Sequence, residues 1–324
     1  MYSVTVNALH RNSARSGKCT TSHCLRSLLL FVVLCTILVV LCFTEVLVDK
    51  STQSVAKEVY INPKYISVNT LIIVPGHGVL KTARGYEWRN NSRWCLESHQ
   101  LRNDVVLPFC FASHIKRAVE ILKTDIVSSV VIFSGGQTCS AAGPRSEALS
   151  YYTIAEETGL FGLFETNVDV ENILRERLFT EEFAEDSYEN LLFSVARFCE
   201  ITGRFPTSIV VVGWKHKEER FTKYHRKAIR FPRSRFTYVG LDFKDAAPFA
   251  TSDLPYMMAQ PYSDTIALSF VTKDMYLCSA GKQTRRKRNP YSRVAPYTLS
   301  CPPLRALLQH CGPHLISSEL TPWN

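Results

Sequence analysis

The sequence predicts an α/β fold in which helices cover both faces of a parallel sheet, preceded by an N-terminal transmembrane helix. Three short runs rich in valine and isoleucine, at residues 70–74, 129–133 and 209–212, each stop close to a glycine. Such runs are typical of buried parallel strands. Helical patterns separate them, and strands that alternate with helices form one sheet with right-handed crossovers.

The first predicted element is the apolar stretch at residues 27–44, which carries no charge over eighteen residues. This length is at the short limit for a membrane-spanning helix, and the four basic residues of 1–26 precede it, whereas Glu45 and Asp49 follow it. We therefore expect a cytosolic N-terminus (1–26), a transmembrane signal anchor (27–48), a stem (49–68) and a lumenal or extracellular α/β domain (69–324) with a C-terminal extension from about residue 245. A cleavable signal peptide, for which no small-x-small site is present, and a mitochondrial presequence that would direct the chain to a mitochondrial membrane are the alternatives.

The charge pattern argues against a nucleic-acid partner. The chain carries +9, of which residues 1–44 hold +4 and residues 275–324 hold +6, so that the stretch between them is close to −1. A nucleic-acid-binding core would be basic. The hydrophobic fraction of 46% also excludes a disordered chain.

Helical patterns fill the gaps between the predicted strands. Apolar side chains recur at helical spacing in 113–123, in 146–158, from Tyr188 to Cys199 and from Phe221 to Ile229. A fourth strand is predicted at 236–241. Ligands of such folds bind at the carboxyl ends of the strands, where the unusual residues of this sequence collect.

The first strand ends in Gly76-His77-Gly78. Lys81 stands where a dinucleotide fingerprint requires its third glycine, so a nicotinamide or flavin site is not predicted. These glycines allow a ligand to approach the backbone, and His77 can donate a proton to it. A strand-stopping turn with a surface histidine is the alternative.

The second strand ends in Ser134-Gly135-Gly136, and a helix opens just after Arg145 with Glu147 in its first turn. A glycine loop that leads to a helix start offers unpaired N–H groups to an anion. An ordinary turn followed by a helix cap is the alternative.

Two further segments carry candidate polar groups. Asp186 and Asn190 share one helix face, although Asp186 can equally be an N-cap with Glu189 reaching back toward it. The third strand ends in Gly213-Trp214-Lys215-His216-Lys217-Glu218-Glu219-Arg220, which gathers an aromatic ring, cations and a histidine at one strand end. A solvated helix start is the alternative for this segment.

Cysteine and asparagine patterns bear on the compartment. No C-x-x-C pair occurs, so no metal site is predicted. In an oxidising lumen, Cys301 is expected to pair with Cys311 or with Cys278, whereas Cys199 lies on an apolar helix face and is expected to be buried. Asn90-Asn91-Ser92 is a glycosylation sequon, which agrees with a lumenal domain.

Taken in order, the strand-end segments resemble those of the DUF218 family, which comprises YdcF-like, SanA-like and ElyC-like proteins. The resemblance rests on I-I-V-P-G-H-G at 72–78, F-S-G-G-Q-T at 133–138, A-G-P-R-S-E-A at 142–148, F-A-E-D-S-Y-E-N at 183–190 and V-V-V-G-W-K at 210–215. The tail, with Cys301-Pro302 and Cys311-Gly312-Pro313, is similar to that of the branch found in fungi and plants. Within such a tail, the basic run at 285–288 is interpreted as a solvated loop.

The resemblance implies a Rossmann-like three-layer domain, in bacteria often membrane-anchored and linked to cell-envelope biogenesis, and S-adenosylmethionine as a ligand of one relative. Bacterial members often carry T-S-x-x-H-x-x-R after the third strand, whereas here Arg220 follows His216 by four residues, which puts a role for His216 in doubt. The implied pocket residues are Gly76, His77, Ser134, Gly135, Gly136, Glu147, Asp186, Ser187, Glu189 and Asn190.

These observations together predict a single-pass membrane protein whose strand-end glycine loops bind a small anionic or nucleotide-like ligand. If it is an enzyme, Glu147 and Asp186 are the candidate general acid and base, and His77 is the candidate proton donor. The candidate ligand-binding residues are Gly76, Gly78, Ser134, Gly135, Gly136, Arg145, Ser187, Glu189, Asn190, Trp214 and Lys215. A non-catalytic scaffold or binding protein of the secretory membrane is the alternative, and a SAM-dependent enzyme is a weaker one.

Overall fold

The structure, a computed structural model, describes residues 29–43 and 61–323, with gaps at 82–84, 98–99, 101–106 and 250–263. The chain divides into two compact units, Met1–Ala56 and Lys57–Asn324. In the first unit a helix spans residues 29–43, inside the predicted anchor at 27–48, whose other residues lie outside those described. Among the described residues, no helix combines the length and the apolar character needed to cross a membrane.

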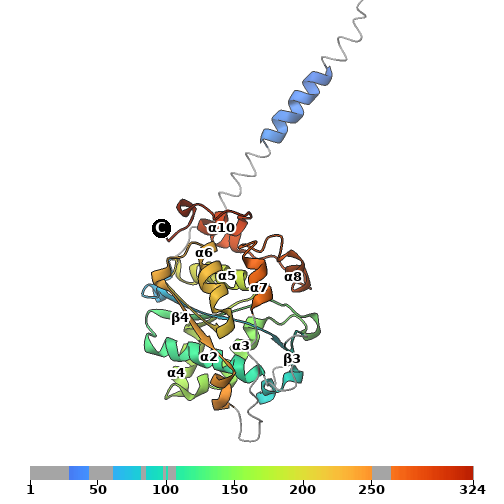
Figure 1. The fold of residues 1–324 in the computed structure, drawn as a ribbon. Coiled ribbons are helices and arrows are strands. Elements are labelled where there is room, and N and C mark those ends of the chain that lie inside the picture. The colour runs from blue at the N-terminus through green and yellow to red at the C-terminus, as the bar shows by residue number, and fades with distance from the viewer. Residues whose placement is uncertain are drawn as a thin grey trace, which may run out of the picture. The chain divides into compact units, whose positions relative to one another are not determined.

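Five parallel strands form the centre of the second unit, in the order β5-β4-β1-β6-β7. Figure 1 shows this sheet between helices. Four of the five strands confirm the predicted strands to within two residues at either end. The strands are β1 (Thr70–Pro75), β4 (Ser129–Ser134), β5 (Leu178–Glu181), β6 (Ser208–Trp214) and β7 (Phe236–Leu241).

Helices cover both faces of this sheet, as predicted. The side chains of β1 alternate between two cores: Leu71 and Ile73 pack under one face and Ile72 and Val74 under the other. The first face is covered by α5 (Ser187–Thr202), the π-helical segment η8 (Arg220–His225) and α6 (Arg226–Ala228), and the second by α2 (Leu107–Thr124) and α3 (Glu147–Glu157).

Among the elements that were not predicted are the strand β5 and the helix α4. The strand β5 has only four residues, L-F-T-E, and its polar half hides the apolar run that marks the other strands. The helix α4 (Asn167–Glu176) buries only Ile173 and Leu174, with Val170 packed beside them, so its apolar face is short.

The C-terminal segment is part of the core and not a loose extension. It contains the short helices α7 (Thr265–Val271), α8 (Lys282–Lys287), α9 (Tyr297–Ser300) and α10 (Arg305–Gln309). Tyr297, Cys301 and Leu304 are buried in the cluster that α5 forms with the sheet. A disulfide joins Cys278 to Cys311, so both pairings expected for Cys301 were wrong. Cys301 is a buried free thiol, and Cys199 is buried as predicted.

A second disulfide lies close to the ends of the sheet strands. A small antiparallel hairpin, β2 (Val79–Leu80) with β3 (Trp94–Cys95), follows β1. Cys95 at its end pairs with Cys139 in the loop after β4. This bond ties the loops that follow β1 and β4 to each other.

Candidate functional site

The strand order places a topological switch point between β1 and β6. From β1 the chain builds the sheet outward through β4 to β5, and it then returns to the other side of β1 to form β6 and β7. Loops on either side of such a point run in opposite directions and leave room for a ligand at the carboxyl ends of the strands. Here His77 follows β1, and the segment from Trp214 to Lys217 follows β6.

His77 lies in an aromatic environment at this switch point. Its ring stacks on Trp214, with centroids 6.1 Å apart, and meets His114 edge-on at 5.8 Å. Its carbonyl oxygen accepts from Gln100 Nε2 at 2.8 Å. Burial, reinforced by Lys217 and His114, lowers the pKa of His77 well below its usual value. The ring is therefore neutral at physiological pH, and its buried Nε2 has no hydrogen-bond partner in the described part of the chain.

Lys217 approaches His77 from the other strand end. Its Nζ lies 3.3 Å from His77 Nδ1, so the neutral imidazole can accept from the ammonium group. Desolvation, with the positive charge of Arg220 as the next cause, lowers the pKa of Lys217 to about 7, and Arg288 acts in the same direction. Three cations from η7 (Lys215–Lys217), η8 and the C-terminal segment thus act on one another at the switch point.

Only part of this positive charge is balanced within the chain. Arg220 forms a largely buried ion pair with Asp264 at 3.0 Å. The Arg288 guanidinium is 3.9 Å from Glu147 and 3.7 Å from Glu97, both longer than a direct hydrogen bond. Lys217 forms no direct ion pair among the residues described, and the more distant carboxylates of Asp264 and Glu147 offset only part of the effects that lower its pKa.

The glycine loops enclose Glu147. A Cβ atom on Gly76 would lie 2.5 Å from the Cβ of Glu147, and one on Gly135, where φ is +153°, would lie 2.6 Å from its Oε2. Glycine is required at both positions because the carboxylate packs directly on the backbone. Thr138 Oγ1 donates to Glu147 Oε1 at 2.7 Å. The Glu147 carboxylate therefore faces the loops after β1 and β4.

Asp186 has the capping role that was the alternative to a catalytic one. Its Oδ1 accepts from the Glu189 N–H at 2.9 Å, and Glu189 Oε2 accepts from the Glu185 N–H at 2.8 Å. Arg285 then bridges both carboxylates, with Nε 2.6 Å from Asp186 and 3.1 Å from Glu189. Burial and the charge of Asp186 raise the pKa of Glu189 to about 8. Asp186, Glu189 and Arg285 therefore bond to one another at the N-terminus of α5.

Ser134 and Asn190 point into the interior and not toward the glycine loops. Ser134 Oγ donates to Glu181 Oε2 at 2.7 Å, and Asn190 Nδ2 donates to the Ser134 carbonyl at 3.1 Å. Tyr297 OH completes this buried network by donating to Glu181 Oε1 at 3.0 Å. Burial raises the pKa of Glu181 to about 7, although each of its hydrogen bonds opposes that shift.

Three other predicted site residues lie in different surroundings. Arg145 donates to the carbonyl oxygens of Lys81 and Ala142, which orders the loop after β4. Lys215 is exposed and pairs with Glu218. Gly78 lies beside the carbonyl of Cys95 in the β2–β3 hairpin, where a Cβ atom would approach that oxygen to 3.2 Å.

The glycosylation sequon lies on the surface of the second unit. Asn90 is exposed and caps η3 (Asn91–Arg93), with its side-chain oxygen accepting from the Ser92 N–H at 2.9 Å. No group of metal-binding side chains occurs among the described residues.

The basic run at 285–288 is not the solvated loop that was expected. Arg286 and Lys287 are exposed. Arg285 on α8 faces the carboxylates at the start of α5, and Arg288, the residue that follows α8, faces Glu147 of α3. Sequence reasoning missed His225, because no local signal identifies a histidine that lies in an apolar helical pattern. Lys217 belongs to the segment singled out after the third strand, but Trp214 and Lys215 were named there as binding residues and Lys217 was not.

The fold and its strand ends define a doubly wound α/β protein with a cationic, partly buried switch point. No protein-family model matches the chain, and no solved structure matches it. The chain is 33% identical over 267 residues to the uncharacterized protein YOR238W of Saccharomyces cerevisiae. The match covers 70% of this chain and 86% of the yeast protein. The chain belongs to the same family as that yeast protein.

Proposed function

We propose that this protein binds a small anionic ligand, phosphate-bearing or nucleotide-like, at the switch point between β1 and β6. The observation that carries the proposal is the contact of Lys217 Nζ with His77 Nδ1 at 3.3 Å, beside Arg220 and Arg288. Bringing these cations together without a full set of carboxylates costs free energy, which a bound anion would recover.

Two further parts of the proposal rest on the sequence. Membership of the DUF218 family rests on the strand-end segments. The Gly76 and Gly135 amides, which were expected to be unpaired, donate to the carbonyls of Ser134 and Glu181, so the ligand is proposed at the switch point and not on these amides. Attachment to a membrane through residues 27–48 rests on their apolar character and on the basic N-terminal flank. The main domain would then face the lumen or the cell exterior.

One observation favours a non-catalytic binding or scaffold protein as the second candidate. Asp186, a candidate general acid or base, is engaged in capping α5 and in pairing with Arg285. A SAM-dependent enzyme has less support, because β4 ends at Ser134 and offers no acidic residue to a ribose at that point.

Isothermal calorimetry on the full-length chain in detergent tests the proposal. The probes are sulfate, inorganic phosphate, pyrophosphate, a sugar nucleotide and S-adenosylmethionine. We expect at least one phosphate-bearing probe or sulfate to bind, and Lys217→Met to weaken that binding at least tenfold. Lys223→Met is the matched control, because Lys223 pairs with Glu219 on the exposed side of η8. Absence of anion binding, or equal binding by Lys217→Met, would overturn the proposal.

A further inference from the structure

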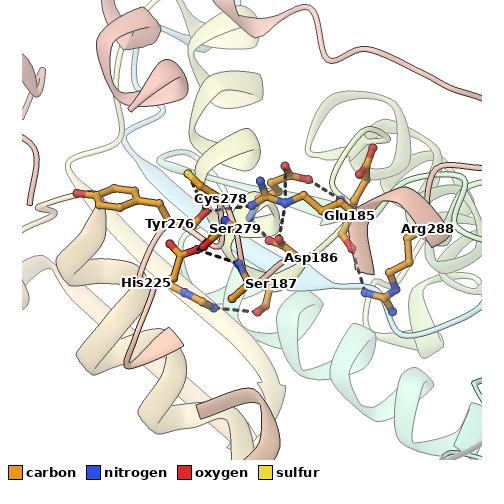
Figure 2. A network of polar contacts seen from close by, with 12 residues as sticks. Glu185, Asp186, Ser187, His225, Tyr276, Cys278, Ser279 and Arg288 are labelled. Carbon is orange, nitrogen blue, oxygen red and sulfur yellow. Dashed lines mark hydrogen bonds and ion pairs between the residues drawn. The ribbon is translucent and has the colours of Figure 1, made fainter. Parts of the chain in front are cut away.

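A serine and a histidine from different elements meet at the start of α5. Ser187 Oγ lies 2.8 Å from His225 Nε2, as the dashed line in Figure 2 shows. Ser187 is the first residue of α5 and is partly exposed, whereas His225 ends η8 and has no exposed surface. The pair has the distance and the accessibility pattern of a nucleophile and its base.

From this arrangement we infer that Ser187 is a catalytic nucleophile toward phosphate esters, with His225 as its general base. The inference rests on the proposed function, because the cations that would hold the phosphoryl group belong to the same region of the molecule. It assigns a reaction to a site that the binding proposal leaves without one.

Packing fixes the orientation of the base. Phe221 meets the His225 ring edge-on with centroids 5.3 Å apart, and Tyr188 meets it at 5.9 Å. The buried Nδ1 has no hydrogen-bond partner among the described residues, so no carboxylate orients the ring as in a triad. The π-helical turn that ends at His225 belongs to a class of distortion often found at functional sites.

The charge around His225 suits an anionic substrate. Burial lowers its pKa well below the usual value, and the charges of Arg220 and Arg285 lower it further. The resting imidazole is therefore neutral and can accept the Ser187 proton. Both arginines are paired with carboxylates, Arg220 with Asp264 and Arg285 with Asp186 and Glu189. The negative charge of a phosphoryl group bound beside them would still raise the basicity of His225 when substrate is present.

The first turn of α5 supplies hydrogen-bond donors for the negative charge of a bound phosphoryl group. The Asp186 carboxylate accepts a hydrogen bond from the N–H of Glu189, and helix geometry leaves the N–H groups of Ser187 and Tyr188 without an intrahelical acceptor. These groups lie at the positive end of a helix of sixteen residues. They can therefore stabilise charge that develops on the phosphoryl oxygens.

The reaction balances with water as the only co-reactant. Ser187 Oγ forms a bond to phosphorus while the ester P–O bond breaks; the Ser187 proton passes to His225 Nε2 and from there to the departing alkoxide. Water then attacks the phosphoserine and gives its proton to His225, and the Oγ–P bond breaks. The proton returns to Ser187, and inorganic phosphate leaves.

The test combines turnover of 4-nitrophenyl phosphate with intact mass after an acid quench, on the full-length chain in detergent. We expect nitrophenolate release and a transient phosphoryl adduct on Ser187 in the wild type. Ser187→Ala should abolish the adduct and lower turnover by a factor of about 100 or more, and His225→Gln should lower turnover by a similar factor. Ser194→Ala is the matched control, because Ser194 is a buried serine of the same helix.

Calorimetry with sulfate separates the two proposals. Normal sulfate binding by Ser187→Ala, together with loss of turnover, supports a nucleophile and excludes a mere folding defect, even where His225→Gln fails to fold. Wild-type protein that binds sulfate but releases no nitrophenolate overturns this inference and leaves the anion site intact. Turnover of 4-nitrophenyl acetate alone also overturns it, and loss of all anion binding overturns both.

Discussion

Arg285 and Asp186 lie 99 residues apart in the sequence, and yet Arg285 Nε donates to Asp186 Oδ2 at 2.6 Å. Both side chains are largely shielded, with exposed fractions of 22% and 9%. Arg285 also donates to the Tyr276 carbonyl at 3.2 Å. The C-terminal segment is therefore fastened to the start of α5 by a side chain that serves two carboxylates and one carbonyl.

Arg285→Met should destabilise the domain by about 2 kcal/mol, because it leaves the carboxylates of Asp186 and Glu189 without their cation. The partial exposure of Arg285 keeps the loss below that of a fully buried pair. Urea unfolding followed by circular dichroism gives the free energy. Arg286→Met is the control, since Arg286 is exposed and should change stability by less than about 0.5 kcal/mol. Equal stability of the two variants would contradict a fastening role.

Glu181 should make the stability of the domain fall as pH rises from about 5 to 8. Its folded pKa is raised to about 7 from an ordinary 4.5, so the folded state holds a proton that the unfolded state has lost. The stabilising contribution is complete below pH 4.5 and is lost as pH passes 7, to a total of at most about 3 kcal/mol. The pKa of Glu189 is raised as well, so Glu189 also lowers stability as pH rises. The Glu181→Gln variant separates the part of the pH dependence that is due to Glu181.

The pH slope of the unfolding free energy, measured in urea at intervals between pH 5 and 8, should be smaller in Glu181→Gln than in the wild type. Arg286→Met, a substitution at an exposed side chain that is not a carboxyl group, should keep the wild-type slope. Parallel slopes for wild type and Glu181→Gln would show that Glu181 is ionised in the folded state throughout.

Local pattern was enough to predict the sheet, because buried parallel strands are continuous apolar runs. Residues 70–74 and 129–133 are such runs, and both are strands in the structure. The edge strand β5 escaped prediction because Thr180 and Glu181 interrupt its apolar run. Glu181 is buried only because Ser134, Tyr297 and the Phe183 N–H bond to it, and no local pattern in the sequence reports those partners.

The candidate site was predictable only where it follows a strand. His77 and Glu147 follow from the glycine loops, since a strand that stops at glycine places the next residues at the carboxyl edge of the sheet. Arg285 and His225 depend on tertiary packing: one reaches Asp186 from the C-terminal segment, and the other is hidden in an apolar helical pattern. Long-range polar contacts of this kind leave no periodic trace in the sequence.

Asn90 should carry one glycan if the main domain enters the lumen. It is the asparagine of the sequon at 90–92, its side chain is exposed, and it lies in the second unit, beyond the predicted anchor. Translation in the presence of microsomes should give a form of lower mobility that endoglycosidase H returns to the unmodified position. Neither Asn90→Gln nor Ser92→Ala should give the form of lower mobility. An unmodified, protease-sensitive domain would contradict lumenal topology.

Binding of sulfate should weaken as pH rises above 7, because sulfate does not titrate there and Lys217 does. Free Lys217 has a pKa of about 7, lowered by desolvation and by Arg220, and a bound dianion favours its ammonium form and so raises that pKa. Above pH 7 binding must then take up a proton, and affinity falls by up to about tenfold per pH unit. Calorimetry at pH 6.5, 7.5 and 8.5, chosen to bracket that pKa of about 7, measures the trend.

Lys217→Arg keeps its charge across this range and should bind with a weaker pH dependence. Other groups that titrate there, Glu189 among them, affect both proteins alike, so an equally steep decline in Lys217→Arg would mean that Lys217 does not contact the anion.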